Sequence, residues 1–292
     1  MAHQAPALPL LRAVRPRQWL KNVLVFAAPV AAGTLTSWPV LGRVSLTFVV
    51  FCLMSGAVYL VNDVRDADSD RRHPVKCHRP VAAGEVSVVT AVTSAVVLCV
   101  CAAALSVLVN WRLTVLLGLY AALSLAYSFG IKREPVFDLA VVTAGFLLRA
   151  VAGGVAAQVP LSEWFLLVAS FGSLFMVAGK RYADVVQAES AEGVEWDVVG
   201  YTASFLRFVW GMAAAVTITA YSLWAFQVGA SQGEPGWAQL SVAPFTLAIL
   251  RYALDVDRGA AGAPEDVVLG DRSLLVLGAI WLVLFAAAAD VG

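Results

Sequence analysis

Residues 44–70 read VSLTFVVFCLMSGAVYLVNDVRDADSD, an uncharged apolar run that ends abruptly in acidic residues. A helix needs about 20 mostly apolar residues to cross about 30 Å of hydrocarbon, and residues 44–63 meet that length. Charged side chains are costly inside the hydrocarbon, so the acidic end should lie at the membrane boundary. The stretch therefore predicts a membrane-spanning helix that carries a carboxylate cluster at one end.

Similar apolar segments recur along the whole chain. The 292 residues are 60% hydrophobic and only 14% charged, against about 45–50% and about 25% in soluble domains. We therefore predict an all-α, polytopic membrane protein whose residues 1–292 form a single membrane-embedded domain. Its nine expected transmembrane helices lie near 20–37, 44–63, 88–109, 111–129, 136–157, 162–180, 205–227, 237–254 and 273–291.

Three other features of the sequence narrow the class of protein. Residues 19–33 follow several arginines like a secretory signal peptide, but eight further apolar segments favour a retained first span. The formal net charge is zero, which excludes a generic nucleic-acid binder. The four cysteines show neither a disulfide framework nor the spacing of a zinc site.

The distribution of basic residues predicts an orientation in the membrane. If the connections between nine spans alternate between the two sides of the membrane, all lysines and arginines except Arg43, Arg112 and Arg149 lie on the same side as the N-terminus. Arg43 and Arg112 lie on the opposite side, and Arg149 lies inside the fifth span. The positive-inside rule then places the N-terminus in the cytoplasm and the C-terminus outside. Because most acids share the cytoplasmic side, we expect a membrane-embedded site that opens there, which disfavours a channel or transporter.

The acidic residues after the second span predict a metal site. At 100° per residue, Asp63, Asp66 and Asp70 fall within about 60° of one another on one helical stripe, whereas Asp68 points elsewhere. Three carboxylates this close repel one another unless a cation lies among them. Mg²⁺ is the expected cation, because it favours carboxylate and phosphate oxygens. The alternative interpretation is a solvated helix end.

The connection that follows is basic. It reads His73-Pro74-Val75-Lys76-Cys77-His78-Arg79-Pro80. Lys76 and Arg79 are suited to bind phosphate oxygens, although a topology signal or contact with lipid headgroups would also explain them. We expect the two histidines to be structural.

The pattern Asn62-Asp63-x-x-Asp66-x-x-x-Asp70, followed by Arg79-Pro80, resembles the first acidic motif of the UbiA-type intramembrane prenyltransferase superfamily. The resemblance implies nine helices around a cytoplasm-facing, Mg²⁺-dependent cavity. More narrowly, several segments are similar to the decaprenyl-phosphate phosphoribosyltransferase branch, which transfers 5-phosphoribose from phosphoribosyl diphosphate to a polyprenyl phosphate for cell-wall arabinan. These segments are residues 15–22, 73–76, 132–138, 179–184 and 251–252.

One segment separates the branches of this superfamily. Aromatic prenyltransferases carry a second aspartate-rich motif between helices six and seven, whereas this chain has Gly179-Lys180-Arg181-Tyr182-Ala183-Asp184 there. Its cations favour a clamp for a lipid monophosphate. Lys180 and Asp184 are also spaced for a simple ion pair along one helical face. A prenyltransferase that acts on an aromatic or quinone precursor remains the alternative function.

The fifth span carries two further charged residues. Asp138 and Arg149 lie nearly on one face but about 16 Å apart along the axis, so they cannot pair directly. Arg149 lies deep in the span and should face the bundle interior or a wet cavity, as a phosphate ligand or as the partner of a buried polar group. The superfamily often has a Tyr-x-x-x-Lys pattern at the end of the fourth span, and Tyr127 and Lys132 resemble it but have one extra residue between them.

These considerations define the predicted site. Asp63, Asp66 and Asp70 are the expected Mg²⁺ ligands, oriented by Asn62. The residues expected to bind substrate phosphates are basic: Lys21, Lys76, Arg79, Lys132, Arg149, Lys180 and Arg181. Accessory roles are expected for Tyr127, Asp138 and Asp184. The expected partners are phosphoribosyl diphosphate, a polyprenyl phosphate and membrane lipid, and small-residue runs such as Gly153-Gly154 are compatible with a homo-oligomer.

Overall fold

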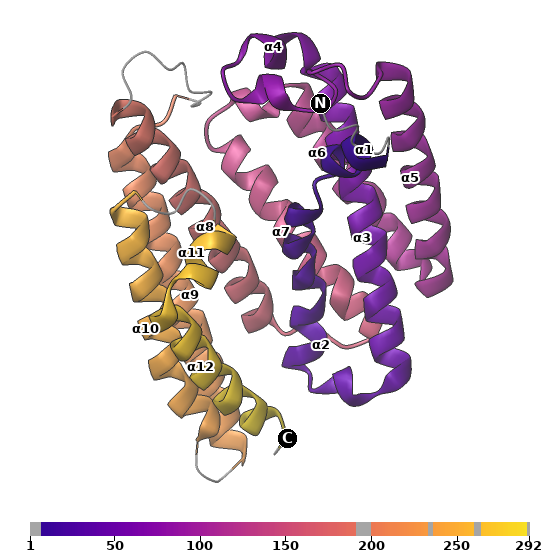
Figure 1. The fold of residues 1–292 in the computed structure, drawn as a ribbon. Helices are drawn as coiled ribbons and strands as arrows, with labels where there is room; N and C mark the ends of the chain where they lie inside the picture. The colour runs from indigo at the N-terminus through magenta and orange to yellow at the C-terminus, as the bar shows by residue number, and fades with distance from the viewer. Residues whose placement is uncertain (1–6, 191–199, 233–235, 260–263, 291–292) are drawn as a thin grey trace. The chain divides into compact units, whose positions relative to one another are not determined.

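The computed structural model describes residues 7–190, 200–232, 236–259 and 264–290, and all regular structure in them is helical (Figure 1). Here η denotes a 3-10 helix. The elements in chain order are α1 (Ala7–Ala13), η1 (Pro16–Phe26), α2 (Ala27–Ala31), η2 (Thr34–Thr36), α3 (Trp38–Arg65), α4 (Ala67–Arg72), η3 (Lys76–His78), α5 (Val88–Val109), α6 (Trp111–Phe129), η4 (Ile131–Arg133), α7 (Phe137–Ala157), α8 (Glu163–Ser190), α9 (Ala203–Gln232), α10 (Trp237–Asp257), α11 (Pro264–Gly270) and α12 (Arg272–Asp290).

Six helices in the described part of the chain are long and apolar enough to cross a bilayer, namely α3, α5, α6, α7, α8 and α9. Each overlaps one of the predicted spans, although α8 extends ten residues beyond the predicted end at residue 180 and α3 begins six residues before the predicted start at residue 44. The chain is an integral membrane protein. Helices α10 and α12 occupy two further predicted spans. Of these, α10 contains Pro244 in its interior and charged residues in its last turns.

Residues 20–37, the first predicted span, do not form one α-helix, so the prediction of a single helix here is wrong, while a membrane pass by this segment stays a prediction. It is divided among η1, α2 and η2. Pro29 lacks a backbone N–H, and Gly33 adopts a positive φ of 63°, which ends the helix. The 3-10 segment η1 is 11 residues long, whereas such segments rarely exceed about four residues. Hydropathy alone does not locate this break, because residues 23–33, in which it falls, are an uncharged and mostly apolar run.

The described residues up to Pro29, together with Thr34–Phe129 and Leu148–Val159, form one compact unit, called unit 1. Within it α3 packs against α5, α6 and η1, so that α3 is the central helix (Figure 1). The fully buried side chains of Phe51 and Leu60 lie on α3. Helix α4 continues from the end of α3 and positions the acidic motif at the end of this unit.

Gly153 on α7 permits a close approach to η1. A Cβ at this position would lie 1.7 Å from the Val25 carbonyl oxygen. We expect Gly153→Ala to lower the free energy of unfolding by about 3 kcal/mol, the upper end of the range for overpacking. Thermal unfolding in detergent, followed by tryptophan fluorescence, measures this change. Gly118→Ala is the matched control, because no atom lies within 4 Å of its added Cβ. An equal loss in both variants would contradict the packing argument.

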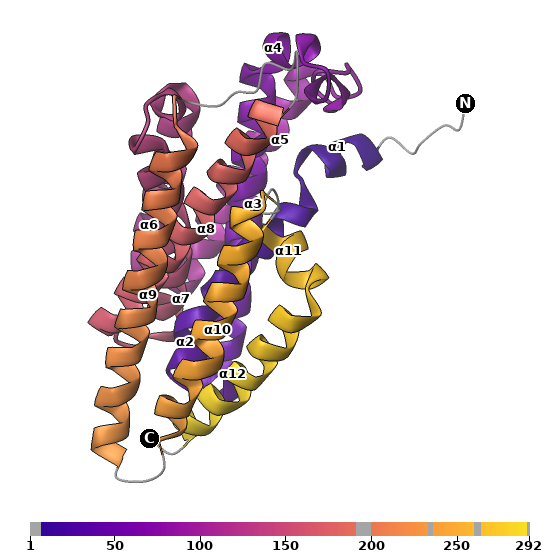
Figure 2. The ribbon, with the colours of Figure 1, turned by 90° about the vertical axis from the view of Figure 1, so that its left-hand side faces the viewer.

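The described residues of Val30–Gly33, Gly130–Leu147 and the chain from Pro160 onward form unit 2. Helix α8 packs along α9, α9 along α10, and α10 against α12 (Figure 2). Phe175, Leu206 and Val256 are fully buried where α8, α9 and α10 meet. This packing fixes α8, whose later turns carry the basic segment 179–184.

Candidate active site

The acidic motif lies at a bend between two helices. Helix α3 ends at Arg65, and Asp66, with φ −90° and ψ 2°, joins it to α4. The hydrogen bonding continues through the bend, because the Asp66 N–H donates to the Asn62 carbonyl at 2.9 Å and the Asp70 N–H donates to the Asp66 carbonyl at 2.8 Å. The predicted continuous helical stripe is therefore bent at its middle carboxylate.

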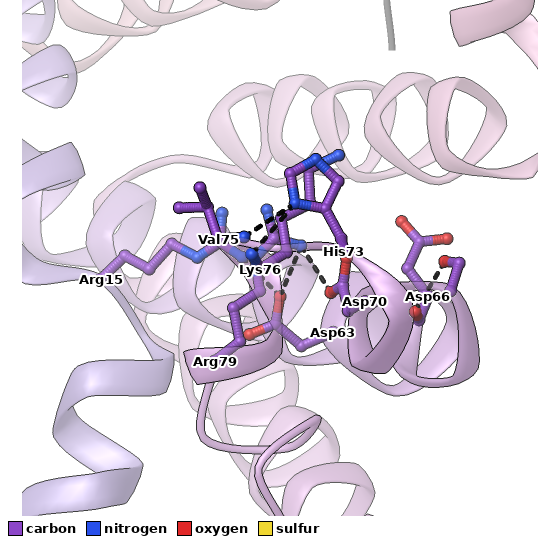
Figure 3. A network of polar contacts seen from close by, with 9 residues as sticks. Arg15, Asp63, Asp66, Asp70, His73, Val75, Lys76 and Arg79 are labelled. Atoms are coloured by element: carbon purple, nitrogen blue, oxygen red, sulfur yellow. Dashed lines mark hydrogen bonds and ion pairs between the residues drawn. The ribbon is translucent and has the colours of Figure 1, made fainter. Parts of the chain in front are cut away.

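Asp63 and Asp70 are brought together by a shared arginine (Figure 3). Arg79 Nη1 donates to Asp70 Oδ2 at 2.7 Å and lies 3.7 Å from Asp63 Oδ1. Arg15 also donates to Asp63 Oδ1. The two carboxylate side chains are only 1% and 4% exposed. The Asp66 carboxylate lies apart from these contacts in Figure 3.

Asp68 behaves as the helical spacing predicts. Its side chain is 87% exposed, and its Oδ1 accepts a hydrogen bond from Arg71 Nη1 at 2.5 Å. It therefore contributes nothing to the buried pair of carboxylates.

The oxygen atoms at the end of α3 fit a hard cation in part. Asp63 Oδ2 and Asn62 Oδ1 are buried, and neither has a hydrogen-bond partner among the described residues. Buried oxygens of this kind are costly unless they bind a donor or a cation. The described residues contain no group of three His, Cys, Asp or Glu side chains close enough together to hold a metal. Asp63 thus has a free oxygen that fits Mg²⁺, with the Asn62 amide oxygen unpartnered at the adjacent position, while Asp66 would have to turn toward Asp63 to share the ion.

His73 shapes the basic connection. Its Nδ1 accepts hydrogen bonds from the backbone N–H groups of Val75 and Lys76, at 3.1 and 3.2 Å (Figure 3). The imidazole therefore closes the turn that leads into η3 and on to Arg79. This agrees with the structural role expected for His73.

Arg149 is buried, as expected for a charge deep in a span. Its Nε donates to Asn22 Oδ1 at 2.7 Å, and its Nη2 donates to Tyr120 Oη at 2.9 Å. The guanidinium also lies 4.7 Å from the centroid of the Tyr120 ring. Of the two interpretations left open for Arg149, these contacts match that of a partner for buried polar groups.

Unit 2 contains a second set of charged residues. Arg181 forms a two-pronged contact with Asp138, with Nε to Oδ2 at 2.9 Å and Nη2 to Oδ1 at 2.7 Å. Asp138 is fully buried. Lys180 Nζ lies 2.9 Å from Asp184 Oδ2, which is the ion pair that the spacing allows. Both cations of the basic segment thus carry a carboxylate neighbour.

The remaining predicted residues are half-buried: Lys21 on η1, Lys76 on η3, Tyr127 on α6 and Lys132 on η4. Tyr127 belongs to unit 1 and Lys132 to unit 2. Tyr201 fixes the segment after η4, since its Oη accepts the Val136 N–H at 2.8 Å. Burial raises the pKa of Tyr201 above the ordinary tyrosine value, at which the hydroxyl is already neutral at physiological pH.

Sequence reasoning did not assign Arg15, Asn22 or Tyr120 to the site. Arg15 and Asn22 lie in the segment 15–22, which carries part of the family resemblance. Tyr120 is a polar residue in the middle of an apolar span, and that position is the only signal by which it could have been found.

Comparison with known proteins gives a consistent result. Residues 23–269 match the model of the UbiA prenyltransferase family. The decaprenyl-phosphate phosphoribosyltransferase of Mycobacterium tuberculosis is 49% identical over 288 residues, which cover 97% of this chain and 95% of that protein. The enzyme of the same name from Corynebacterium glutamicum is 48% identical over 94% of this chain and 84% of that protein. The structure of a UbiA homolog from Archaeoglobus fulgidus bound to GPP and Mg²⁺ superposes with a TM-score of 0.73 at 18% identity, over 97% of this chain and 99% of that one, and shows the same fold.

Proposed function

The chain belongs to the UbiA prenyltransferase family, and on that premise we propose that it transfers 5-phosphoribose from phosphoribosyl diphosphate to a polyprenyl phosphate, with decaprenyl phosphate as the acceptor, and releases diphosphate. The observation that carries this proposal is the near-full-length identity of 49% to a decaprenyl-phosphate phosphoribosyltransferase. The product would supply cell-wall arabinan.

The acidic motif of unit 1 would bind the donor. We assign Asp63, Asp66 and Asp70, oriented by Asn62, to a Mg²⁺ ion. When bound, this ion would neutralise charge on the departing diphosphate. The unpartnered oxygens of Asp63 and Asn62 support the assignment. Lys21, Lys76 and Arg79 would contact donor phosphate oxygens directly, because they lie on η1, on η3 and just after η3 in the same unit.

The basic segment of unit 2 would bind the acceptor phosphate. Lys180, Arg181 and Lys132 supply the positive charge, while Asp138 and Asp184 orient two of these cations through the ion pairs described above. The acceptor phosphate is already ionised at neutral pH, so attack on the anomeric carbon needs no general base. Positioning and charge stabilisation are then sufficient to accelerate the transfer. Arg149 and Tyr127 would support the site from within the bundle.

We propose that both units act as one membrane domain, residues 1–292, with nine membrane passes around a cavity that opens to the cytoplasm. The lysine and arginine distribution supports a cytoplasmic N-terminus and an external C-terminus. A site at the membrane interface suits a reaction in which one substrate is lipid-soluble and the other is water-soluble. It would also limit hydrolysis of the activated sugar.

The alternative function is transfer of an isoprenoid from its diphosphate to an aromatic or quinone precursor. It would use the same acidic motif. Segment 179–184 counts against it, since Lys180 and Arg181 stand where that reaction needs further carboxylates.

One set of assays with the purified protein tests these functions. Phosphoribosyl diphosphate plus decaprenyl phosphate and Mg²⁺ should yield phosphoribosylated lipid and diphosphate. A prenyl diphosphate plus 4-hydroxybenzoate should yield no product, and the reverse pattern would overturn the proposal. EDTA should abolish binding of phosphoribosyl diphosphate far more than binding of decaprenyl phosphate, because only the carboxylate cluster needs a bridging cation.

A further inference from the structure

Arg15 has an unusual backbone conformation. Its φ of 54° and ψ of 66° place it in the left-handed region, and it precedes Pro16. This region costs a non-glycine residue of order 1–3 kcal/mol and persists only where surrounding contacts hold it. Strain of this kind is typical of positions where the backbone must aim a particular side chain.

The side chain of Arg15 reaches the acidic motif. Its guanidinium donates to Asp63 Oδ1 and lies 4.9 Å from the centroid of the Tyr59 ring. Together, Arg15 and Arg79 balance the negative charges of Asp63 and Asp70, which are almost completely buried. Buried carboxylates need such partners in the absence of a metal.

A metal ion that binds the Asp63 carboxylate must share this carboxylate with the positively charged Arg15 guanidinium. With both arginines still in place, two buried carboxylates would face two guanidiniums and a divalent ion, an uncompensated positive charge in a buried site. Release of Arg15 removes part of this charge. The incoming diphosphate compensates the rest, and a guanidinium binds phosphate oxygens as well as it binds a carboxylate.

We propose that Arg15 is a donor-binding residue that exchanges partners: it neutralises Asp63 while the site is metal-free, and it transfers to the diphosphate when Mg²⁺ binds. This inference rests on the proposed function, because it requires Mg²⁺ at Asp63. It predicts that Arg15 opposes the binding of Mg²⁺ alone and favours the binding of the metal-bound donor.

The unmodified protein provides the first test. Phenylglyoxal reacts with free guanidinium groups, and mass spectrometry measures the extent of reaction at each arginine. Mg²⁺ alone should raise the rate of modification at Arg15 severalfold, and phosphoribosyl diphosphate added with Mg²⁺ should lower it again. Arg71, whose carboxylate partner is the exposed Asp68, is the internal control and should not change.

The second test uses a variant suited to the backbone at this position. Asn tolerates the left-handed region better than most residues, so Arg15→Asn removes the guanidinium with little added strain. Calorimetry should show Mg²⁺ binding about tenfold tighter, equal to about 1.4 kcal/mol. Binding of phosphoribosyl diphosphate in saturating Mg²⁺ should be about tenfold weaker. Arg15→Lys should give intermediate values for both.

Arg12→Asn is the matched control, because Arg12 lies three residues earlier and pairs with the exposed Glu85. It removes the same charge without touching Asp63 and should leave both affinities unchanged. If Arg15→Asn fails to fold, the modification of the unmodified protein decides the question alone.

The two hypotheses fail in different ways. If the unmodified protein binds neither Mg²⁺ nor phosphoribosyl diphosphate, the proposed function is wrong. If it binds both, the proposed function stands. The exchange of partners is then wrong if Mg²⁺ does not change the rate of modification at Arg15, or if Arg15→Asn changes the affinities for Mg²⁺ and for phosphoribosyl diphosphate in the same direction.

Discussion

Asp63→Asn should lower kcat by about a hundredfold to a thousandfold, the range expected when one charge-stabilising group is removed from an active site. The variant loses an anionic Mg²⁺ ligand at the end of α3. It also leaves Arg15 and Arg79 beside a neutral amide instead of a carboxylate. Steady-state kinetics over a range of Mg²⁺ concentrations measures the effect, and excess Mg²⁺ should not restore the rate.

Asp68→Asn is the matched control for this prediction. It removes the same charge five residues later, from a side chain that is 87% exposed. We expect its kcat and its Mg²⁺ dependence to stay close to those of the unmodified protein. Equal damage in both variants would mean that the cluster of Asp63 and Asp70 has no special role.

Arg181→Ala should lower the free energy of unfolding by about 3–5 kcal/mol, the cost of leaving a buried charge without its partner. The charge is that of Asp138, which is fully buried and accepts two hydrogen bonds from the Arg181 guanidinium. Thermal unfolding in detergent measures the loss. The double variant Asp138→Asn with Arg181→Gln should recover part of it, because no uncompensated charge then remains.

Lys180→Ala is the control for stability and the better test of the acceptor clamp. Lys180 is 42% exposed, so its removal should change the unfolding temperature little. It should instead raise KM for the polyprenyl phosphate, with no change in the Mg²⁺ requirement. If Lys180→Ala leaves KM unchanged, Lys180 serves only as the neighbour of Asp184.

The sequence allowed the main features of unit 1 to be predicted because they depend on local periodicity. Hydropathy located α3, and the spacing of its acidic residues brought Asp63 and Asp70 to one side. The bend at Asp66 escaped prediction, since a helical projection assumes that the helix continues.

The contacts that complete the charged clusters join residues far apart in the chain. Arg15 and Asp63 are 48 residues apart, and Asp138 and Arg181 are 43 apart. The charge and hydropathy of a sequence indicate that a charged residue in an apolar segment needs a partner. They do not identify which distant residue the fold places beside it. For this reason Arg181 was predicted as a phosphate ligand without its carboxylate.

The broken N-terminal segment has a consequence for biosynthesis. Asn22 on η1 is held by Arg149, which follows it by 127 residues. At about 5–20 residues per second, the ribosome adds Arg149 about 6–25 s after Asn22. Until then η1 lacks this contact and the close approach of Gly153. The first hydrophobic segment to meet the insertion machinery should therefore be among the last to reach its final conformation, and truncation before α7 should leave it open to protease.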